Sequence, residues 1–201
     1  MAEWIDILDG GRILYDPDFY PRPEADDLLV WLTSQVNWRQ EAVRGNPLPR
    51  LNAWFADDGL RYSYSGLSHH GAGWLPELFA VKQRVEGASG AAFNSLLLNR
   101  YRDGNDSIGF HTDAEPELGE NPVVVTVSFG SARDFVLRHR KTKATLTYRV
   151  GHGSLLVMGG TSQHHWLHAV PKTTEPVGER ISLTFRLIRG TVTSDRESTP
   201  K

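Results

Sequence analysis

Two segments in the first half of the chain have the hydrophobic spacing of amphipathic helices. In residues 22–36, RPEADDLLVWLTSQV, apolar side chains recur at three- and four-residue intervals, with prolines before them and acids in the first turn. Residues 76–90, PELFAVKQRVEGASG, open on a proline and run into glycines that suit a helix end. The pattern predicts one helix in each segment, with an irregular, aromatic-rich stretch between them.

From residue 93 onward the pattern changes to short β-branched or aromatic runs separated by turn residues. The runs are FNSLLLNRY, PVVVTVSFG, RDFVLRH, ATLTYRV, GSLLVMGG, HHWLHAV and RISLTFRLI. This regular alternation of strands and turns predicts a β-sandwich or barrel on which the two helices pack. The fold class expected is therefore mainly β with α.

Composition narrows the chemistry. A chain of 201 residues with 39% hydrophobic residues fits one domain, and 22 basic against 24 acidic side chains give a net charge of -2, which indicates no nucleic-acid or membrane partner by itself. The absence of cysteine excludes disulfides, thiolate metal sites and a thiol nucleophile, so a metal would need His, Asp or Glu. No apolar run approaches the roughly 20 residues of a membrane span, and we expect an intracellular, cytoplasmic protein without a membrane partner.

A candidate metal site lies in GFHTDAEPELG, residues 109–119. Side chains two residues apart leave a strand on the same face, so His111 and Asp113 can reach one ion. The candidate third ligand is His168 in HHWLHAVP, because two imidazoles and one carboxylate form the facial triad of non-haem Fe(II) oxygenases. The alternative for His-x-Asp taken alone is an exposed loop.

The last strand, RISLTFRLI, has one apolar and one polar face. The polar face carries Arg180, Ser182, Thr184 and Arg186. The two arginines lie about 20 Å apart along an extended strand, a span that a dicarboxylate such as 2-oxoglutarate can meet from both ends. Two solvated arginines are the alternative. Asn99 and Tyr101 share a face of an earlier strand and could complete a polar pocket or cap the strand.

Taken together, these motifs resemble the AlkB family of Fe(II)- and 2-oxoglutarate-dependent dioxygenases, which repair alkylated nucleic acid. The ordered set is Asn-x-Tyr, His-x-Asp, His and Arg-x5-Arg, within roughly residues 49 to 188, and the branch with the animal nuclear DNA-repair enzymes is the most similar. The resemblance implies a double-stranded β-helix, or jelly roll, with N-terminal helices packed against it. It divides the chain into residues 1–92 with helices and recognition loops in the same domain, a catalytic core of residues 93–190, and a flexible tail of residues 191–201.

The resemblance also implies roles for particular residues. Iron would be bound by His111, Asp113 and His168. Arg180 would pair with the far carboxylate of 2-oxoglutarate and Arg186 would lie near its metal-proximal end, with Asn99, Tyr101 and Ser182 around the cosubstrate. The implied reaction uses O2, removes N-alkyl groups from bases of the 1-methyladenine and 3-methylcytosine type, and releases formaldehyde, succinate and CO2. The substrate-binding residues implied or inferred are Tyr62, Tyr64, Glu115, Arg138, Arg140 and Lys141.

Each substrate residue has a structural alternative. The tyrosines could pack on the core, Glu115 could be a solvated loop acid, and the basic stretch from Arg133 to Arg149, expected to meet phosphates, could be a solvated hairpin. Among the other histidines, His164 is expected behind the metal ligands on the face of His168, whereas His139 and His152 are expected in loops without a metal.

The substrate itself stays open at this point. Alkylated DNA is the expected partner, single-stranded by preference, because the loop of residues 44–50 offers only Leu48 and prolines where related duplex-repair enzymes insert an apolar wedge. RNA is a further expected substrate, and a monomer is expected. The competing functions are a 2-oxoglutarate oxygenase acting on RNA, protein or a small molecule, a non-catalytic binding module for alkylated nucleic acid, and a metal-dependent hydrolase.

Overall fold

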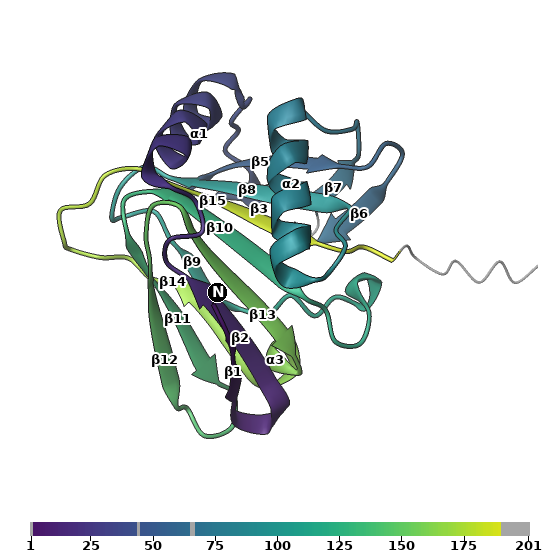
Figure 1. Ribbon diagram of the computed structural model, residues 1–201, viewed down its shortest axis with the longest axis vertical. Helices are drawn as coiled ribbons and strands as arrows, with labels where there is room; N and C mark the ends of the chain where they lie inside the picture. The colour runs from purple at the N-terminus through teal and green to yellow at the C-terminus, as the bar shows by residue number, and fades with distance from the viewer. Residues whose placement is uncertain (1, 44, 65–66, 190–201) are drawn as a thin grey trace, which may run out of the picture.

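Two antiparallel β-sheets form the centre of the protein (Figure 1). The computed structural model describes residues 2–43, 45–64 and 67–189, and for residues 63, 64, 67 and 68 the backbone alone. The larger sheet has the strand order β1 (Trp4–Ile7), β2 (Gly11–Asp16), β13 (Ser154–Gly160), β10 (Val124–Gly130), β15 (Arg180–Arg186), β8 (Ser95–Tyr101) and β5 (Leu51–Ala56). The smaller sheet has the order β12 (Thr145–Val150), β11 (Arg133–His139), β14 (Trp166–Val170) and β9 (Ile108–His111).

Short elements connect the sheets and surround the opening between them. Two small hairpins, β3 (Ala42–Val43) with β4 (Asn46–Pro47) and β6 (Arg61–Tyr64) with β7 (Leu67–His70), precede the core strands. Single helical turns follow three of the strands: η1 (Leu8–Gly10), η2 (Pro116–Leu118) and α3 (Ser162–His165). The two facing sheets form the jelly-roll core that the sequence pattern and the family resemblance predicted.

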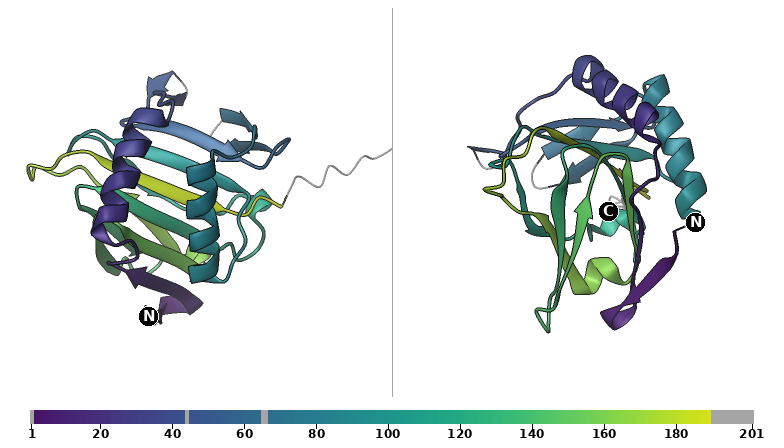
Figure 2. Two further views of the ribbon diagram at one scale, coloured as in Figure 1. Left: turned by 45° about the horizontal axis from the view of Figure 1, so that its top comes forward. Right: turned by 60° about the vertical axis from the view of Figure 1, so that its left-hand side comes forward.

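Helices α1 (Arg22–Gln35) and α2 (Pro76–Ser89) lie across the outer face of the larger sheet (Figure 2). Their bounds confirm the two predicted helices. Leu32 and Leu78 are fully buried in a hydrophobic cluster that includes the sheet residue Leu183, and each such leucine stabilises the fold by about 1.5–3 kcal/mol. Helix α2 ends at Gly90, whose left-handed φ of 68° allows its N–H to donate to the Glu86 carbonyl.

A second hydrophobic cluster fills part of the space between the two sheets. Phe135, Leu137 and Trp166 of the smaller sheet pack there against Leu156 and Met158 of the larger one. The polar face of β15 points into the same space, whereas its apolar face packs under the helices. The polar side chains of this strand therefore face an enclosed cavity and not bulk solvent.

The N-terminal segment differs most from the sequence prediction. Residues 4–16 form a hairpin that adds two strands to the larger sheet, and β5 adds a third from the segment before residue 93. The sequence signal was weak because these three strands, of which β1 and β5 lie at the sheet edges, mix polar and apolar residues. The division of the chain at residue 93 stays a prediction.

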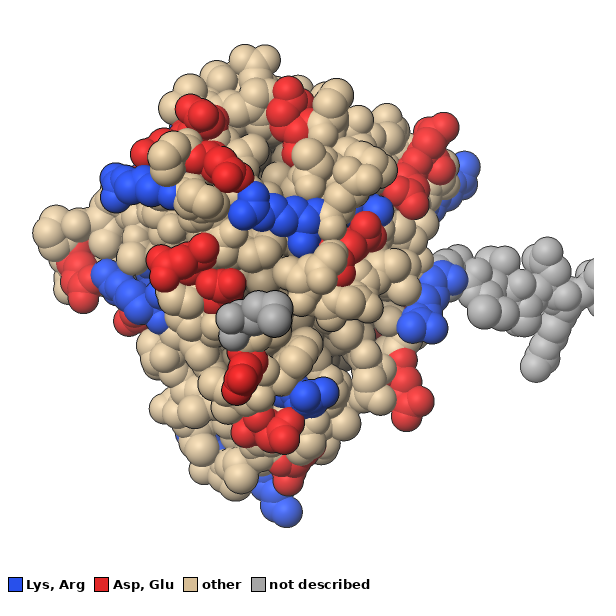
Figure 3. Space-filling view, viewed as in Figure 1, with Lys and Arg blue, Asp and Glu red and all other residues tan. Residues whose placement is uncertain are grey.

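The surface carries charges of both signs. On the face seen in Figure 3, Lys and Arg side chains alternate with Asp and Glu, and no extended basic area is visible there. Within the part of the chain that the structure describes, none of the helices is long and apolar enough to cross a membrane.

Candidate active site

The three predicted metal ligands meet at one end of the space between the sheets. His111 at the end of β9 pairs in register with His168 of β14, and their ring centroids are 4.2 Å apart. Asp113 follows β9 by two residues, and its Oδ2 lies 3.6 Å from His168 Nε2. One ligand atom from each side chain lies within 4.8 Å of the others. His111 Nδ1 is 2.8 Å from the Gly109 carbonyl, and a proton on Nδ1 leaves Nε2 with the lone pair that a metal needs.

Two neighbouring side chains hold the Asp113 carboxylate and its backbone in place. Arg186 Nη2 donates to Asp113 Oδ1 at 2.8 Å, and the Asp113 N–H donates to Gln163 Oε1 at 2.9 Å. Burial raises the pKa of Asp113, but the charges of Arg186 and of the imidazoles outweigh burial and lower this pKa to about 2. Burial lowers the pKa of His168 to about 3. At neutral pH the site therefore presents a carboxylate and a neutral imidazole, the forms that bind a metal.

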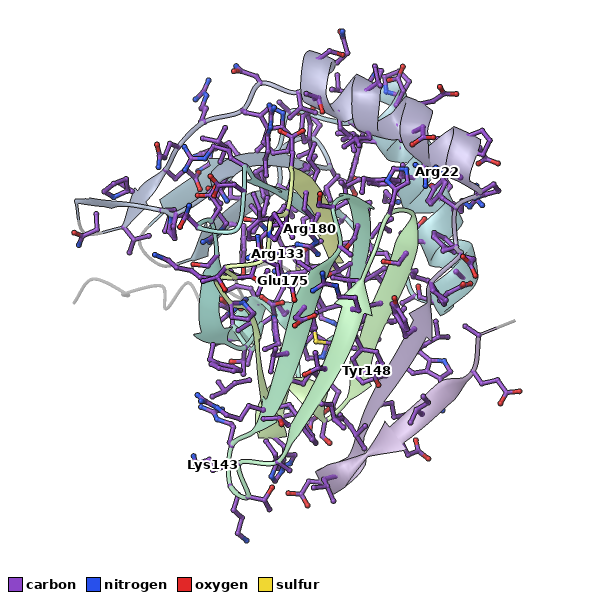
Figure 4. The ribbon with its side chains drawn as sticks, turned by 90° about the vertical axis from the view of Figure 1, so that its left-hand side faces the viewer. Arg22, Arg133, Lys143, Tyr148, Glu175 and Arg180 are labelled. Carbon is purple, nitrogen blue, oxygen red and sulfur yellow. The ribbon has the colours of Figure 1, made fainter. Side chains whose placement is uncertain are left out.

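A cavity of about 470 Å³ opens from these ligands and is lined by the polar face of β15. Arg180 lies at its inner part with only 1% of its surface exposed, close to Arg133 in Figure 4. Its Nη2 donates to Ser128 Oγ at 2.8 Å, and its guanidinium covers the Tyr101 ring at 5.1 Å. Burial lowers the pKa of Arg180, which reflects how poorly this cation is solvated.

The other predicted cosubstrate residues line the same cavity. Asn99 is buried, and its Oδ1 accepts hydrogen bonds from Arg50 Nε at 2.8 Å and from Asn52 Nδ2 at 2.7 Å. Ser182 lies between the two arginines on β15 and is 3% exposed. The fold thus brings together the cavity-lining residues Asn99, Tyr101, Ser182, Arg180 and Arg186.

The residues present fit both an iron ion and 2-oxoglutarate. Asp113 Oδ2 is buried without a hydrogen-bond partner beside two imidazoles, which suits a divalent cation. Arg180 Nε and Nη1 are likewise buried without partners and suit a carboxylate. A buried charged group with unpaired atoms is costly, so these atoms indicate the sign of the ligand that completes the site.

Two of the three predicted base-binding residues, Tyr62 and Glu115, line the cavity. Tyr62 is buried and lines the cavity, and burial followed by the charge of Glu115 raises its pKa. Glu115 also lines the cavity, and its Oε2 is buried without a hydrogen-bond partner. The side chain of Tyr64 lies outside the described part of the structure.

The three predicted phosphate-binding residues lie on or just after β11. The guanidinium carbon of Arg138 lies 3.8 Å from the centre of the Phe110 ring. Phe110 is next to His111 in the sequence and lines the cavity, with 39% of its surface exposed. Arg140 and Lys141 are exposed in the turn that follows β11. Arg138 is therefore the member of this basic stretch that lies beside the cavity.

Two other members of the basic stretch are paired with groups of the protein itself. Arg133 is 1% exposed and donates to the backbone carbonyls of Asp103 at 2.9 Å, Asp106 at 3.0 Å and Pro171 at 2.6 Å. Arg149 is paired with Asp134 and with Glu175 on the surface. The prediction that the stretch from Arg133 to Arg149 meets phosphates is therefore wrong at Arg133, and at the exposed Arg149 it stays a prediction.

Two predictions about histidines also fail. His164 is exposed in α3 and contacts the Glu120 carbonyl, because β14 begins only at Trp166 and the residues before it form a helical turn. Gln163 takes the supporting position that was expected for His164. His139 is not in a loop but is buried on β11, where its Nε2 contacts Asp9. No sequence signal indicated Gln163, Arg50 or Ser128, because their contacts depend on how the strands pair.

Comparisons with known proteins agree with this geometry. Residues 12–186 match the protein family described as the 2OG-Fe(II) oxygenase superfamily. Over 191 residues the chain is 39% identical to the rat alpha-ketoglutarate-dependent dioxygenase alkB homolog 3, covering 88% of this chain and 64% of that protein. Over 184 residues it is 35% identical to the human DNA oxidative demethylase ALKBH2, and this match covers 84% of this chain and 70% of that protein. The chain thus spans about two thirds of the length of these relatives.

Solved structures show the same fold at low sequence identity. The structure of OsALKBH1 matches with a TM-score of 0.65 and 14% identity over 92% of this chain and all of that one. An oxidoreductase of the 2OG-Fe(II) oxygenase family from Burkholderia pseudomallei matches with a TM-score of 0.60 and 16% identity. This match covers 91% of this chain and 87% of that one. With the family match and the curated relatives, the resemblance inferred from the motifs is confirmed, and the chain belongs to the 2OG-Fe(II) oxygenase superfamily.

Proposed function

We propose that this protein is an oxidative demethylase that removes N-alkyl groups from nucleobases in DNA. The observation that carries the proposal is one cavity in which the buried carboxylate of Asp113 lies close to two imidazoles and the buried cation of Arg180 has two nitrogens without partners. The superfamily uses Fe(II), 2-oxoglutarate and O2, and two curated relatives are named dioxygenase and DNA oxidative demethylase.

Each group in the cavity has a distinct task in this proposal. His111, Asp113 and His168 would hold the iron, which supplies the oxidising chemistry once O2 and 2-oxoglutarate are bound. Arg180 would bind the far carboxylate of 2-oxoglutarate, with Asn99, Tyr101 and Ser182 around it. Arg186 fixes the orientation of the Asp113 carboxylate through its 2.8 Å hydrogen bond and lies at the metal-proximal end of the cosubstrate. The products are formaldehyde, succinate, CO2 and the unmodified base.

The substrate side is less enclosed and favours a base taken out of its stack. Tyr62 and Glu115 line the cavity, and a carboxylate there favours the cationic bases 1-methyladenine and 3-methylcytosine. Tyr64 is proposed to stack on the same base. Arg138 on Phe110 offers a cation and an aromatic ring for the strand just outside, with Arg140 and Lys141 farther along.

Leu48 lines the cavity, but apart from it the loop of residues 44–50 offers only prolines as apolar residues, so we infer that single-stranded DNA is preferred over duplex. RNA is the second candidate polymer, because the cavity contacts proposed here involve the base and not the sugar. Action on cellular DNA places the protein inside the cell, and we expect it to act as a monomer.

The proposal is tested by measuring formaldehyde and succinate together. The protein is incubated with Fe(II), 2-oxoglutarate and matched oligonucleotides with and without one 1-methyladenine or 3-methylcytosine, each single- and double-stranded and in DNA and RNA form. Lesion-dependent release of both products, faster on single-stranded DNA, is expected. Succinate without formaldehyde on every oligonucleotide would point to another substrate, and no succinate with metal bound would point to a binding module.

A further inference from the structure

A second group of metal-ligating side chains lies outside the catalytic cavity, where three distant segments meet. Asp9 is in η1 at the tip of the β1–β2 hairpin, His139 ends β11, and His165 ends α3. One ligand atom from each lies within 4.8 Å of the other two, as is also the case in the catalytic triad. None of the three residues lines the catalytic cavity, so this cluster is separate from the site described above.

The side-chain geometry suits a metal of the zinc type. His139 is 2% exposed, and its Nε2 is 3.0 Å from Asp9 Oδ2. Ligands about 2.1 Å from a tetrahedral zinc ion lie about 3.4 Å from one another, so only small side-chain movements would bring His165 to the same ion. The Thr142 N–H donates to His139 Nδ1 at 3.2 Å, so in the ligand-free protein the ring proton is on Nε2 and faces Asp9 Oδ2. A metal at Nε2 would require this proton to move to Nδ1, which lies 2.9 Å from the acceptor Thr142 Oγ1.

The backbone around the cluster is fixed by hydrogen bonds between the three segments. The Thr161 hydroxyl before α3 donates to the Asp9 carbonyl, and Trp166 Nε1 donates to the Leu8 carbonyl at 3.1 Å. The Arg140 N–H donates to the His165 carbonyl at 2.7 Å. In Figure 1 the tip of the hairpin accordingly lies beside α3. The ligands are therefore held near one another before any ion binds, which lowers the conformational entropy lost on binding.

We propose that Asp9, His139 and His165 form a second divalent-cation site, selective for borderline-soft ions such as Zn(II). Two imidazoles and one carboxylate favour Zn(II), Co(II) or Ni(II), whereas Mg(II) and Ca(II) require oxygen ligands. The ion would tie the N-terminal hairpin to the smaller sheet and to α3. Because α3 also carries Gln163, which accepts a hydrogen bond from the Asp113 backbone, a metal here stabilises the helix turn that supports the catalytic carboxylate.

The test separates the two sites by mutation and measures binding directly. In tag-free, metal-free protein, the variant His111→Ala with His168→Ala removes the catalytic ligands. Isothermal titration of this variant with Zn(II) should show one ion per chain. Zn(II) at about 100 times its Kd should raise the Tm by about 5–10 °C. Wild-type protein should bind two ions, and His165→Ala alone should bind one, which keeps the test valid if the double variant does not fold.

Two further variants distinguish metal binding from hydrogen bonding. Asp9→Asn, added to the double variant, should abolish Zn(II) binding, since asparagine tolerates the left-handed φ of 58° and keeps a hydrogen bond to His139 but lacks the charge. His164→Ala, which removes the adjacent exposed histidine, should leave the stoichiometry unchanged. One ion in wild-type protein, or Zn(II) binding that Asp9→Asn and His165→Ala do not affect, would overturn the proposal and leave the cluster as a hydrogen-bonded clamp.

Discussion

Replacing Arg180 with methionine should weaken 2-oxoglutarate binding without weakening the fold. Arg180 is 1% exposed, and its Nε and Nη1 have no hydrogen-bond partner, while Nη2 is bonded to Ser128. If both unpaired nitrogens bind the far carboxylate, the variant loses two charge-assisted hydrogen bonds. At about 1.5–3 kcal/mol each, this loss is about 3 kcal/mol or more, which raises the Kd for 2-oxoglutarate by at least about 100-fold.

The same substitution should leave the free energy of unfolding of the ligand-free protein unchanged or increase it. A buried cation with unpaired nitrogens destabilises the fold, and an apolar side chain of similar volume removes that cost, by about 1–4 kcal/mol in comparable cases. Arg133 provides the matched control, because it is equally buried and lies nearby (Figure 4) but donates to three backbone carbonyls. Arg133→Met leaves those carbonyls unpaired and should lower the free energy of unfolding by about 3 kcal/mol or more.

The assay combines calorimetric titration and urea unfolding. Binding of 2-oxoglutarate is titrated with Mn(II) in place of iron, so that no turnover occurs, and unfolding is measured on ligand-free protein. A Kd for Arg180→Met within threefold of wild type would place the far carboxylate elsewhere. A loss of stability as large as that of Arg133→Met would show that Arg180 has a structural role and would refute the reasoning from its unpaired atoms.

Three further predictions concern the metal, the base and the strand. Gln163→Leu should lower metal affinity about 10–100-fold while protein folding is retained, because the Asp113 N–H loses its acceptor; metal titration checks this. Glu115→Gln should lower kcat/KM for 1-methyladenine about tenfold but leave the neutral lesion 3-methylthymine nearly unchanged, as measured by formaldehyde release, and equal losses would contradict a charge effect. Arg138→Ala should weaken binding of single-stranded DNA and reduce its salt dependence by about one counterion, whereas Arg149→Ala, whose guanidinium is already paired, should do neither.

The alternating pattern of β15 is the clearest case in which sequence predicted structure. Its apolar residues pack under the helices and its polar residues line the cavity, as a period of two requires. Local pattern also predicted both helices and the core strands, because each of these elements has one face in a hydrophobic core. The His-x-Asp pair and His168 could be assigned to one site only through the family motif, because the contact between β9 and β14 joins segments far apart in the chain.

Residues whose role depends on a partner in another strand could not be predicted. Arg133 and Arg180 both begin strands and look alike in sequence, yet Arg133 is fully hydrogen bonded and Arg180 is not. Gln163 was missed because it lies between two predicted strands, where residues 162–165 form a helical turn. The hydrogen bonds that distinguish these side chains join residues at least 27 positions apart, namely Arg133 to Asp106, Arg180 to Ser128 and Asp113 to Gln163, and local pattern contains no information about them.

Three cavity side chains with unpaired buried atoms each have the charge opposite to that of the ligand expected beside them. Asp113 Oδ2 offers negative charge where a metal cation is expected, Arg180 offers positive charge where a carboxylate is expected, and Glu115 Oε2 offers negative charge where a cationic base is expected. Such atoms destabilise a fold unless a ligand of opposite charge pairs with them, and the equally buried Arg133 shows that this fold can satisfy a buried guanidinium with its own backbone. Because Asp113, Arg180 and Glu115 all line the binding cavity, the stability of the protein should increase as metal, cosubstrate and alkylated base are added in turn.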